Sequence, residues 1–150
     1  MLCSMFGSET LRELRSCLLA AEEQFKEKVY PRIHPFTDIR TAGDILQSSG
    51  FKLCVADDIT IKVPTKDVYQ LVKLIRSMGE NNYLNIDKPN ISRSIWNKTS
   101  ELMKDVTPTE DGVMSTFQIL TLTGWKYHAD QPKPLKPGSA KISLADFFDK

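Results

Sequence analysis

The sequence lacks the glycine patterns that hold nucleotide cofactors. Its seven glycines stand at positions 7, 43, 50, 79, 112, 124 and 138, and no two of them lie two residues apart. A G-x-G turn, which lets the backbone lie close to a nucleotide, therefore does not occur. The motifs G-x-x-x-x-G-K-S/T, H-E-x-x-H and G-x-S-x-G are absent too. We identify no cofactor-binding loop in these residues.

Cysteine and histidine are also scarce, which argues against a metal site. Cys3, Cys17 and Cys54 form no C-x-x-C pair, and each lies among apolar neighbours. This pattern favours buried thiols in a reducing compartment over zinc ligands. His34 and His128 could act as general bases or contact a substrate, but loop histidines more often hydrogen-bond to the backbone. The sequence therefore assigns no catalytic residue.

Excess charge and long apolar runs are missing as well. The 150 residues carry a formal net charge of +1, with 26% charged and 41% hydrophobic residues. A nearly neutral chain has no electrostatic reason to bind nucleic acid, and the lysine-rich segment KPLKPGSAK has no interleaved aromatic residues. No apolar run approaches the roughly 20 residues of a membrane span. These absences favour an ordinary globular domain without nucleic acid or a membrane span.

The spacing of the apolar residues predicts alternating strands and helices. Apolar or alternating runs predict strands over residues 1–6, 51–55, 59–63 and 113–125, with a turn or bulge at 56–58. Amphipathic stripes predict helices over 11–26 and 38–48, a third between Pro64 and Gly79, and a fourth after Ser92. This order indicates an α/β layer architecture. Residues 1–130 would form this domain, and residues 131–150 a tail rich in proline and lysine.

Three of the predicted helices begin with residues typical of N-caps. Thr10 is followed three positions later by Glu13, which predicts a capping box at the first helix. Thr37 and Ser92 are the expected N-caps of the second and fourth helices. These caps fix where the helices are expected to begin.

Three arginines are the first candidates for a binding site. Arg12 and Arg15 lie three residues apart and would share a helix face, and with Arg40 they could hold a carboxylate or phosphate. A solvated helix face, with Glu13 and Glu22 as ion-pair partners, explains the same pattern. Both interpretations stay open at this point.

Asparagine and tryptophan supply the remaining candidates. Asn81, Asn82 and Asn85 could make amide contacts to a ligand, although the loop-forming tendency of asparagine explains them equally well. Trp125 follows Gly124 at the end of the strongest predicted strand, where a packing role competes with a stacking role. The sequence thus offers two sets of polar candidates, one cationic and one amide.

Several segments together resemble one known family. They are MFGSETLRELRSCLLAAEEQ, PFTDIRTAGDILQSSGF, VYQLVKLIRSMGENNYL, TFQILTLTGWKYH and PLKPGSAKISLADFF. They resemble the methyltransferase-like family of biotin-synthesis malonyl-carrier-protein methyltransferases and of the mitochondrial and alphaproteobacterial homologues tied to respiratory complex I assembly. The resemblance covers nearly the whole chain and looks closest to the second branch.

The resemblance implies a position within a larger fold. In that family the sheet is a class I, Rossmann-like methyltransferase sheet of strand order 3-2-1-4-5-7-6. On this pattern residues 1–6 would be strand 5, residues 51–63 strand 6, and residues 113–124 strand 7, inserted between them. The strands that bind S-adenosylmethionine would lie upstream. The chain is therefore expected to be the acceptor-side, C-terminal part, which binds no cofactor and has no methyltransferase activity alone.

The resemblance also implies partners and an acceptor. The outer edge of residues 1–6 would be bare, so this strand is expected to be disordered, covered by the tail, or paired with a second chain. That chain would be the missing half, a protein partner or a second copy. A location in the bacterial cytoplasm or the mitochondrial matrix follows from the same family.

Two kinds of acceptor fit the family. A carboxylate, as in the biotin branch, would be held by Arg12, Arg15 and Arg40. A protein side chain, as in the assembly branch, would lie in a groove lined by Asn81, Asn82 and Trp125. A non-catalytic assembly module for a complex I subunit, or a side-chain hydroxylase on the same fold, is the alternative function.

Overall fold

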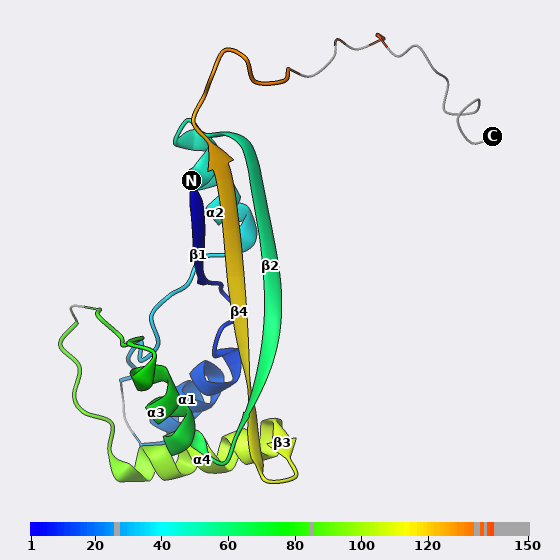
Figure 1. Ribbon diagram of the computed structural model, residues 1–150. Helices are drawn as coiled ribbons and strands as arrows, with labels where there is room; N and C mark the ends of the chain where they lie inside the picture. Colours follow the sequence, from blue (N-terminus) through cyan, green and yellow to red (C-terminus); the bar gives the residue numbers. More distant parts are fainter. Residues whose placement is uncertain (26–27, 85, 134–135, 137, 140–150) are drawn as a thin grey trace.

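A central strand pairs with two neighbours that run antiparallel to it. The computed structural model describes residues 1–25, 28–84, 86–133, 136 and 138–139. Its strand order is β1-β4-β2, and the short β3 pairs with the beginning of β4 (Figure 1). The strands are β1 (Leu2–Phe6), β2 (Lys52–Thr65), β3 (Pro108–Thr109) and β4 (Gly112–Trp125).

β4 is central because its sequence suits burial on both faces. Its β-branched and aromatic residues pack against both helix layers, and most of the strand is buried. β2 is one continuous strand, so the prediction of a turn or bulge at 56–58 is wrong. The irregularity lies between Lys52 and Val55, where Leu53 has a φ of 50°. Pairing with the long β4 keeps the two aspartates at 57 and 58 in the strand.

Four helices flank the sheet, and their starts test the predicted caps. They are α1 (Arg12–Phe25), α2 (Ile39–Ser48), α3 (Val68–Ser77) and α4 (Arg93–Val106). The Ser92 cap is confirmed, because its Oγ accepts from the amide of Ile95. The Thr37 cap is wrong: the carboxylate of Asp38 accepts from the amide of Thr41 and takes that role.

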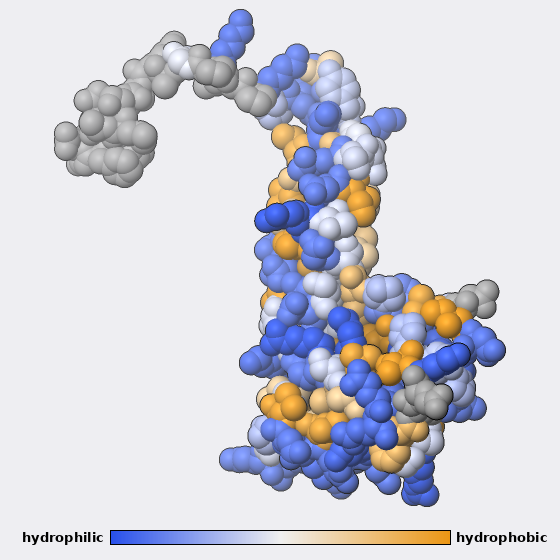
Figure 2. All heavy atoms as spheres, turned by 180° about the vertical axis from the view of Figure 1, so that it is seen from behind, coloured by the Kyte–Doolittle hydropathy of each residue, from blue (hydrophilic) through white to orange (hydrophobic). Residues whose placement is uncertain are grey.

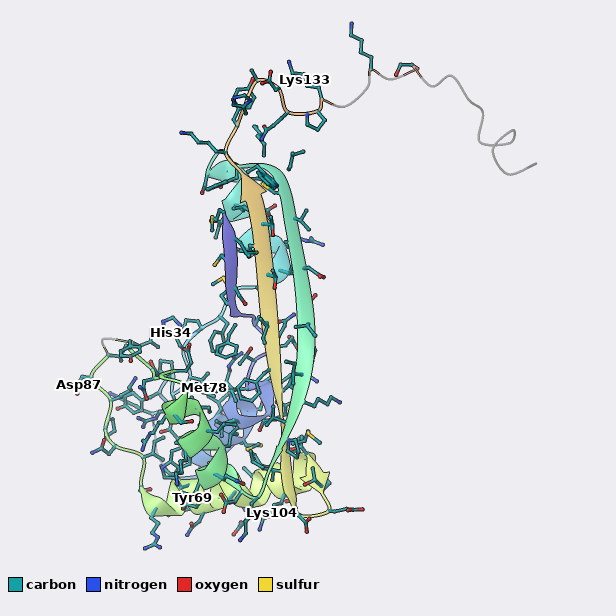
Figure 3. The ribbon with its side chains drawn as sticks, viewed as in Figure 1. His34, Tyr69, Met78, Asp87, Lys104 and Lys133 are labelled. Atoms are coloured by element: carbon teal, nitrogen blue, oxygen red, sulfur yellow. The ribbon has the colours of Figure 1, made fainter. Side chains whose placement is uncertain are left out.

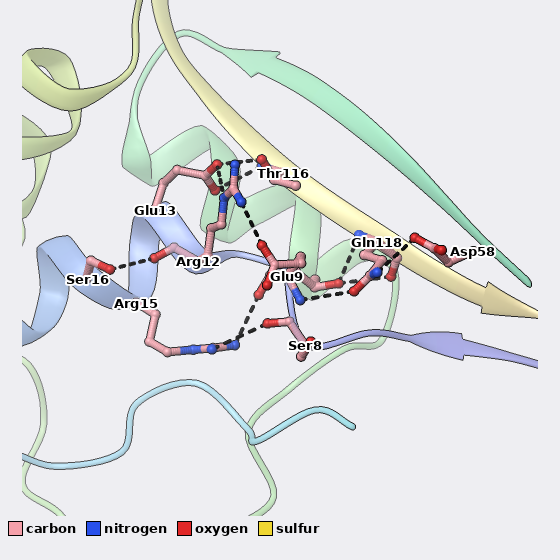
Figure 4. Close-up of polar contacts among 10 residues, drawn as sticks. Ser8, Glu9, Arg12, Glu13, Arg15, Ser16, Asp58, Thr116 and Gln118 are labelled. Carbon is pink, nitrogen blue, oxygen red and sulfur yellow. Dashed lines mark hydrogen bonds and ion pairs between the residues drawn. The ribbon is translucent and has the colours of Figure 1, made fainter. Parts of the chain in front are cut away.

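The predicted capping box at Thr10 is also wrong. Thr10 Oγ1 donates to the carbonyl of Gln118 at 3.0 Å and accepts from the Gln118 amide at 3.1 Å. Glu13 likewise reaches across to β4, where it accepts from the amide and hydroxyl of Thr116 (Figure 4). Both side chains are used to attach α1 to the sheet, so neither is free to close a box at the helix start.

Two separate cores lie on opposite faces of the sheet. Side chains of Val113 and Phe117 join the core under α1, α3 and α4, whereas Leu120 and Leu122 join the core under α2. Alternate residues of a strand face opposite ways, so the odd and even positions of β4 serve different layers. The α2 layer lies near one end of the sheet and the larger layer near the other (Figure 1).

These observations decide some of the expectations for the fold. The α/β class is confirmed, with an antiparallel sheet and four helices. Of the three alternatives for residues 1–6, disorder is wrong, because β1 pairs with β4 from Leu2 to Phe6, whereas cover by the tail or by a second chain stays a prediction. The expected tail at 131–150 falls largely outside the described residues, as does Asn85.

Candidate functional site

A cavity of about 410 Å³ lies at the end of the sheet that α1, α3 and α4 cover. It is open to solvent on one side and lined by α1, the crossover at 32–36, the end of α3, the loop at 80–83 and one residue of α4. Figure 3 shows His34 and Met78 on the crossover and the end of α3, which border this space. Its lining residues are Phe6, Thr10, Leu11, Leu14, Leu18, Arg32, Ile33, His34, Phe36, Val72, Ile75, Arg76, Met78, Glu80, Asn81, Asn82, Tyr83, Ile91, Trp96 and Phe117.

The inner wall of the cavity is apolar and aromatic. Leu14 and Leu18 of α1 are buried there, and Phe117 of β4 closes the floor. Phe6 packs edge-on against Phe36 at 6.1 Å between ring centroids and tilted against Phe117 at 5.9 Å. An apolar cavity with a few polar groups at its edge is the usual form of a small-ligand or side-chain site.

One basic residue of the lining is neutralised. Arg32 Nη2 lies 2.6 Å from Glu22 Oε1, and the side chains are 7% and 1% exposed. Arg32 also donates to the carbonyl of Pro89 at 2.7 Å, and its guanidinium lies 5.1 Å from the centre of the Tyr30 ring. Because its charge and donors are used within the protein, Arg32 shapes the cavity and supplies no free cation.

The loop after α3 is held by a turn and by one asparagine. Gly79, with a φ of 80°, lets the amide of Glu80 donate to the carbonyl of Ile75, which ends α3 in a Schellman motif. Asn82 Nδ2 donates to the carbonyls of Pro31 and Arg32, and its Oδ1 accepts from the amide of Leu84. The loop and the crossover are thereby joined across the mouth of the cavity.

The polar groups that stay available are at the rim. Arg76 and Glu80 carry opposite charges, and neither makes an ion pair with any other residue that the structure describes. His34 Nδ1 lies 2.8 Å from the carbonyl of Pro35, and because a carbonyl only accepts, Nδ1 is the donor in this contact. Asn81 and Tyr83 are exposed beside them. The rim therefore offers one anion, one cation and neutral hydrogen-bonding groups.

The structure brings only part of the predicted site together. Asn81 and Asn82 line the cavity, whereas Trp125, which is 61% exposed, lies at the far end of β4 (Figure 1). Arg40 is on α2, whose core lies on the opposite face of the sheet. These positions place neither Trp125 nor Arg40 beside the two asparagines.

The two arginines of α1 make separate contacts outside the cavity. Arg12 forms ion pairs with Glu9 at 2.6 Å and Glu13 at 3.3 Å, and its hydrogen bond with Glu9 contributes most to raising the pKa of the guanidinium. Arg15 donates to the carbonyls of Ser8 and Thr10 (Figure 4) and lies 6.0 Å from the ring of Phe36. Arg15 therefore contacts Phe36, a residue of the cavity lining, but does not line the cavity itself.

Sequence reasoning missed most of the rim. Glu80 and Tyr83 lie in the loop after the third predicted helix and Arg76 lies within that helix, and none of them was chosen as a candidate. Trp96 lies one residue after the buried Ile95 on α4. An aromatic residue beside an apolar helix stripe was the signal by which the sequence could have identified it as a lining residue. These residues come together because the loop at 80–83 lies beside α1 in the fold. No local pattern in the sequence predicts that contact.

A polar network attaches α1 to β4 beside the cavity. Burial alone would raise the pKa of Glu13, but the hydrogen bonds from Thr116, together with that from Arg12, outweigh it and hold the pKa below its ordinary value. Gln118 Nε2 donates to Asp58 Oδ2 at 2.8 Å, and Gln118 Oε1 accepts from the amide of Glu9 (Figure 4). These contacts fix the start of α1 and hence one wall of the cavity.

Neither a metal cluster nor a membrane helix is found in the described ranges. No three or more histidine, cysteine, aspartate or glutamate side chains of these residues gather where they could hold a metal ion. No helix among them is both long enough and apolar enough to cross a bilayer. The three cysteines are free, Cys17 being buried and Cys3 and Cys54 partly buried.

The structure is thus that of an α/β protein with a largely apolar cavity. No protein-family model matches the chain. It is 35% identical over 144 residues to arginine-hydroxylase NDUFAF5, mitochondrial, of Danio rerio, a match that covers 95% of this chain and 45% of that protein. The human protein of the same name is 33% identical over 144 residues, covering 95% and 42%.

A second group of relatives is more distant. The malonyl-acyl-carrier-protein O-methyltransferase of Xylella fastidiosa is 25% identical over 126 residues, covering 83% of this chain and 41% of that protein. The homologues of the chain are thus the mitochondrial arginine-hydroxylase NDUFAF5 proteins and, at lower identity, these methyltransferases, which confirms the resemblance to this methyltransferase-like family. The chain spans less than half the length of the curated relatives it matches.

Proposed function

We propose that the chain is the acceptor-side part of an S-adenosylmethionine-dependent, methyltransferase-like protein, and that its cavity binds an arginine side chain of a protein acceptor. On this proposal β1, β2 and β4 are strands 5, 6 and 7 of a larger class I sheet. The order β1-β4-β2, with β4 antiparallel to both neighbours, supports that assignment. The cavity is the observation that carries the acceptor role.

The residues of this chain offer no glycine-rich loop for S-adenosylmethionine. The backbone at Gly7 lies against the side chain of Gln118, and that at Gly112 against the carbonyl of Thr65. Both glycines therefore allow close contacts within the protein. The cofactor would be held by the part of the longer relatives that this chain does not match.

The cavity suits the two halves of an arginine side chain. Its apolar wall can cover the aliphatic stem, and the aromatic rings of Phe36, Tyr83 and Trp96 offer faces for a guanidinium. Glu80 supplies a carboxylate at the rim, to which a guanidinium can donate two hydrogen bonds. The more similar relatives, whose name is arginine-hydroxylase, favour this acceptor over the malonyl group of the more distant ones.

Arg76 supports a second candidate function. It is a cation at the same rim with no ion pair to another described residue, so it could hold the carboxylate of a malonyl-type acceptor. The two candidates depend on different residues. An arginine acceptor requires Glu80, whereas a carboxylate acceptor requires Arg76.

Partners and location follow from the same proposal. The outer edge of β1 would pair with the remainder of the longer protein or with a protein partner. The alternative is an assembly module that has the same fold, catalyses no reaction and binds a respiratory complex I subunit. The mitochondrial matrix is the proposed location, since the more similar relatives are named mitochondrial.

Ligand titration by NMR tests the proposal. The probes are N-acetyl-arginine amide, its uncharged isostere N-acetyl-citrulline amide, and monomethyl malonate. We expect the arginine compound alone to shift the amide signals of His34, Glu80 and Tyr83, with saturation near about 1 mM, and Glu80→Gln to abolish the effect. Arg76→Met is the matched control and should leave arginine binding intact.

The opposite results would overturn the assignment. Equal shifts with arginine and citrulline would show that no guanidinium is recognised. Binding of monomethyl malonate that Arg76→Met abolishes would favour the carboxylate acceptor. Saturable binding of S-adenosylmethionine, titrated in the same way, would mean that the chain builds a cofactor site without a glycine loop.

A further inference from the structure

The outer edge of β2 is long, regular and open. Among the described residues β2 pairs only with β4, and its other edge forms the rim of the sheet (Figure 1). The six residues from 57 to 62 are all exposed, including Ile59 at 58% and Ile61 at 41%. Apolar side chains of the sheet reach the molecular surface (Figure 2). An edge of this length is a template for a further strand.

The hydrogen bonds of β4 reveal which groups of β2 point outward. The Gln118 carbonyl accepts from the amide of Gly7, and its amide donates to Thr10, so both groups face the β1 side. Gln118 is the partner of Thr60, which makes this a non-hydrogen-bonded pair. The amide and carbonyl of Thr60 consequently point away from β4, toward the open edge.

The same alternation applies to the neighbours of Thr60. The amide of Thr116, the partner of Lys62, donates to Glu13, and its carbonyl accepts from Leu11, again on the β1 side. Lys62 therefore also presents its backbone outward, as does Asp58 two residues before Thr60. These three residues form an unpaired row of donors and acceptors.

We propose that this edge pairs with the same edge of a second copy, antiparallel and centred on Thr60. A two-fold axis perpendicular to the sheet keeps each face continuous, and it must lie midway between one residue of β2 and the same residue of the other copy. With the axis at Thr60, Asp58 lies opposite Lys62 of the other copy, and Ile59 opposite Ile61. Thr60 pairs with itself through two backbone hydrogen bonds.

The charges on the edge select this register. A centre at 58 would place Asp58 against itself, and a centre at 59 would place Asp57 against Ile61. A centre at 61 would place Lys62 opposite Thr60 and leave Asp58 opposite Pro64. Charged residues on an edge strand usually prevent pairing, but here they complement one another in one arrangement.

The helices leave room for the second copy. α2 covers one face near the beginning of β2, and α3 follows the other end, on the opposite face. The two-fold axis reverses these ends, so the α3 of one copy comes beside the bare face of the other. β1 is the other edge of the sheet, but its five residues carry no charge, so no register of a self-pairing is selected there by charge complementarity.

Sedimentation equilibrium of the 150-residue chain measures the dimer directly. We expect a dimer that Thr60→Pro abolishes; the missing amide of proline faces outward, so pairing with β4 is kept. Lys62→Asp should weaken the dimer at least about tenfold by placing two aspartates opposite each other. Lys104→Asp, which changes an exposed lysine of α4, is the matched control and should have no effect.

A cross-link tests the register independently. Only the residue on the two-fold axis faces its own copy, at a Cα separation of about 5.5 Å that a disulfide can span. Thr60→Cys should therefore give a reducible dimer on mild oxidation, whereas Glu101→Cys on α4 should not. A chain that stays monomeric up to about 1 mM overturns the proposal. So does a dimer that Thr60→Pro and Lys62→Asp leave unchanged, because its interface would lie elsewhere.

Discussion

Glu22 on α1 and Arg32 on the crossover form a buried ion pair that joins two walls of the cavity. Arg32 Nε and Nη2 lie 2.8 Å and 2.6 Å from Glu22 Oε1, and Glu22 Oε2 accepts from the amide of Tyr30. Removing one partner leaves the other charge buried and unpaired. We expect Glu22→Ala to lower the free energy of unfolding by about 3–5 kcal/mol in urea denaturation.

A matched double variant separates the pair from its packing. Glu22→Leu with Arg32→Met removes both charges and keeps the volume of the side chains. It should be more stable than Glu22→Ala, and its cavity should keep its shape. If the single and the double variant lose equal stability, the ion pair between Glu22 and Arg32 is not what holds the crossover against α1.

The contact between Glu13 and Thr116 makes the fold sensitive to acid. Hydrogen bonds hold the folded pKa of Glu13 below its ordinary value of 4.5, so the stabilisation is complete above that value and is lost as the pH falls through the folded pKa. Glu13→Gln should lower stability at pH 7 by about 1 kcal/mol and flatten its dependence on pH below 4.5. Chemical denaturation between pH 3 and 7 measures both effects, and an unchanged pH profile would exclude this role for Glu13.

Gly112 is required where β3 turns into β4. A Cβ atom there would overlap the carbonyl oxygen of Thr65 and the backbone of Lys66. Gly112→Ala should therefore destabilise the protein by about 1–3 kcal/mol. Gly43→Ala is the control, since its Cβ would have only an ordinary contact at 3.7 Å and alanine favours the helix. Thermal unfolding should show a lower midpoint for the first variant and an equal or higher one for the second.

Asn81 and Asn82 are adjacent but should respond differently to alanine. Asn82 holds three backbone groups across the mouth of the cavity, so Asn82→Ala should cost about 1–3 kcal/mol and reduce hydrogen-exchange protection at 80–84. Asn81 is exposed and lines the cavity, so Asn81→Ala should leave stability unchanged within about 0.5 kcal/mol. Equal losses of stability in the two variants would contradict a structural role for Asn82 and a surface position without such a role for Asn81.

Much of the secondary structure followed from local chemistry. The stripe of apolar residues predicted α1, the β-branched run predicted β4, and Ser92 marked the start of α4, because each signal depends on neighbours within a few residues. The predictions failed where a distant strand competed for the same side chain. Thr10 and Glu13 have the spacing of a capping box, but β4 offers them backbone and hydroxyl partners more than 100 residues away.

The cavity depended even more on contacts that are distant in the sequence. Asn81 and Asn82 were recognised as candidates, but the same reasoning chose Arg40 and Trp125, which the fold places on the other face and at the other end of the sheet. Glu80 and Arg76 escaped notice because an exposed charge on a helix end has no distinctive pattern.

The sequence by itself determined the α/β class, the kinship with a methyltransferase-like family and the absence of a glycine-rich cofactor loop. These conclusions depend on residue types and on short spacings, and both can be read from the sequence. Only the tertiary structure decided that β4 runs between β1 and β2, that Arg32 is neutralised by Glu22, and that the backbone of Thr60 faces an open edge. Those relations arise when segments far apart in the chain compete for the same hydrogen bonds and the same buried volume, and that competition is resolved only in three dimensions.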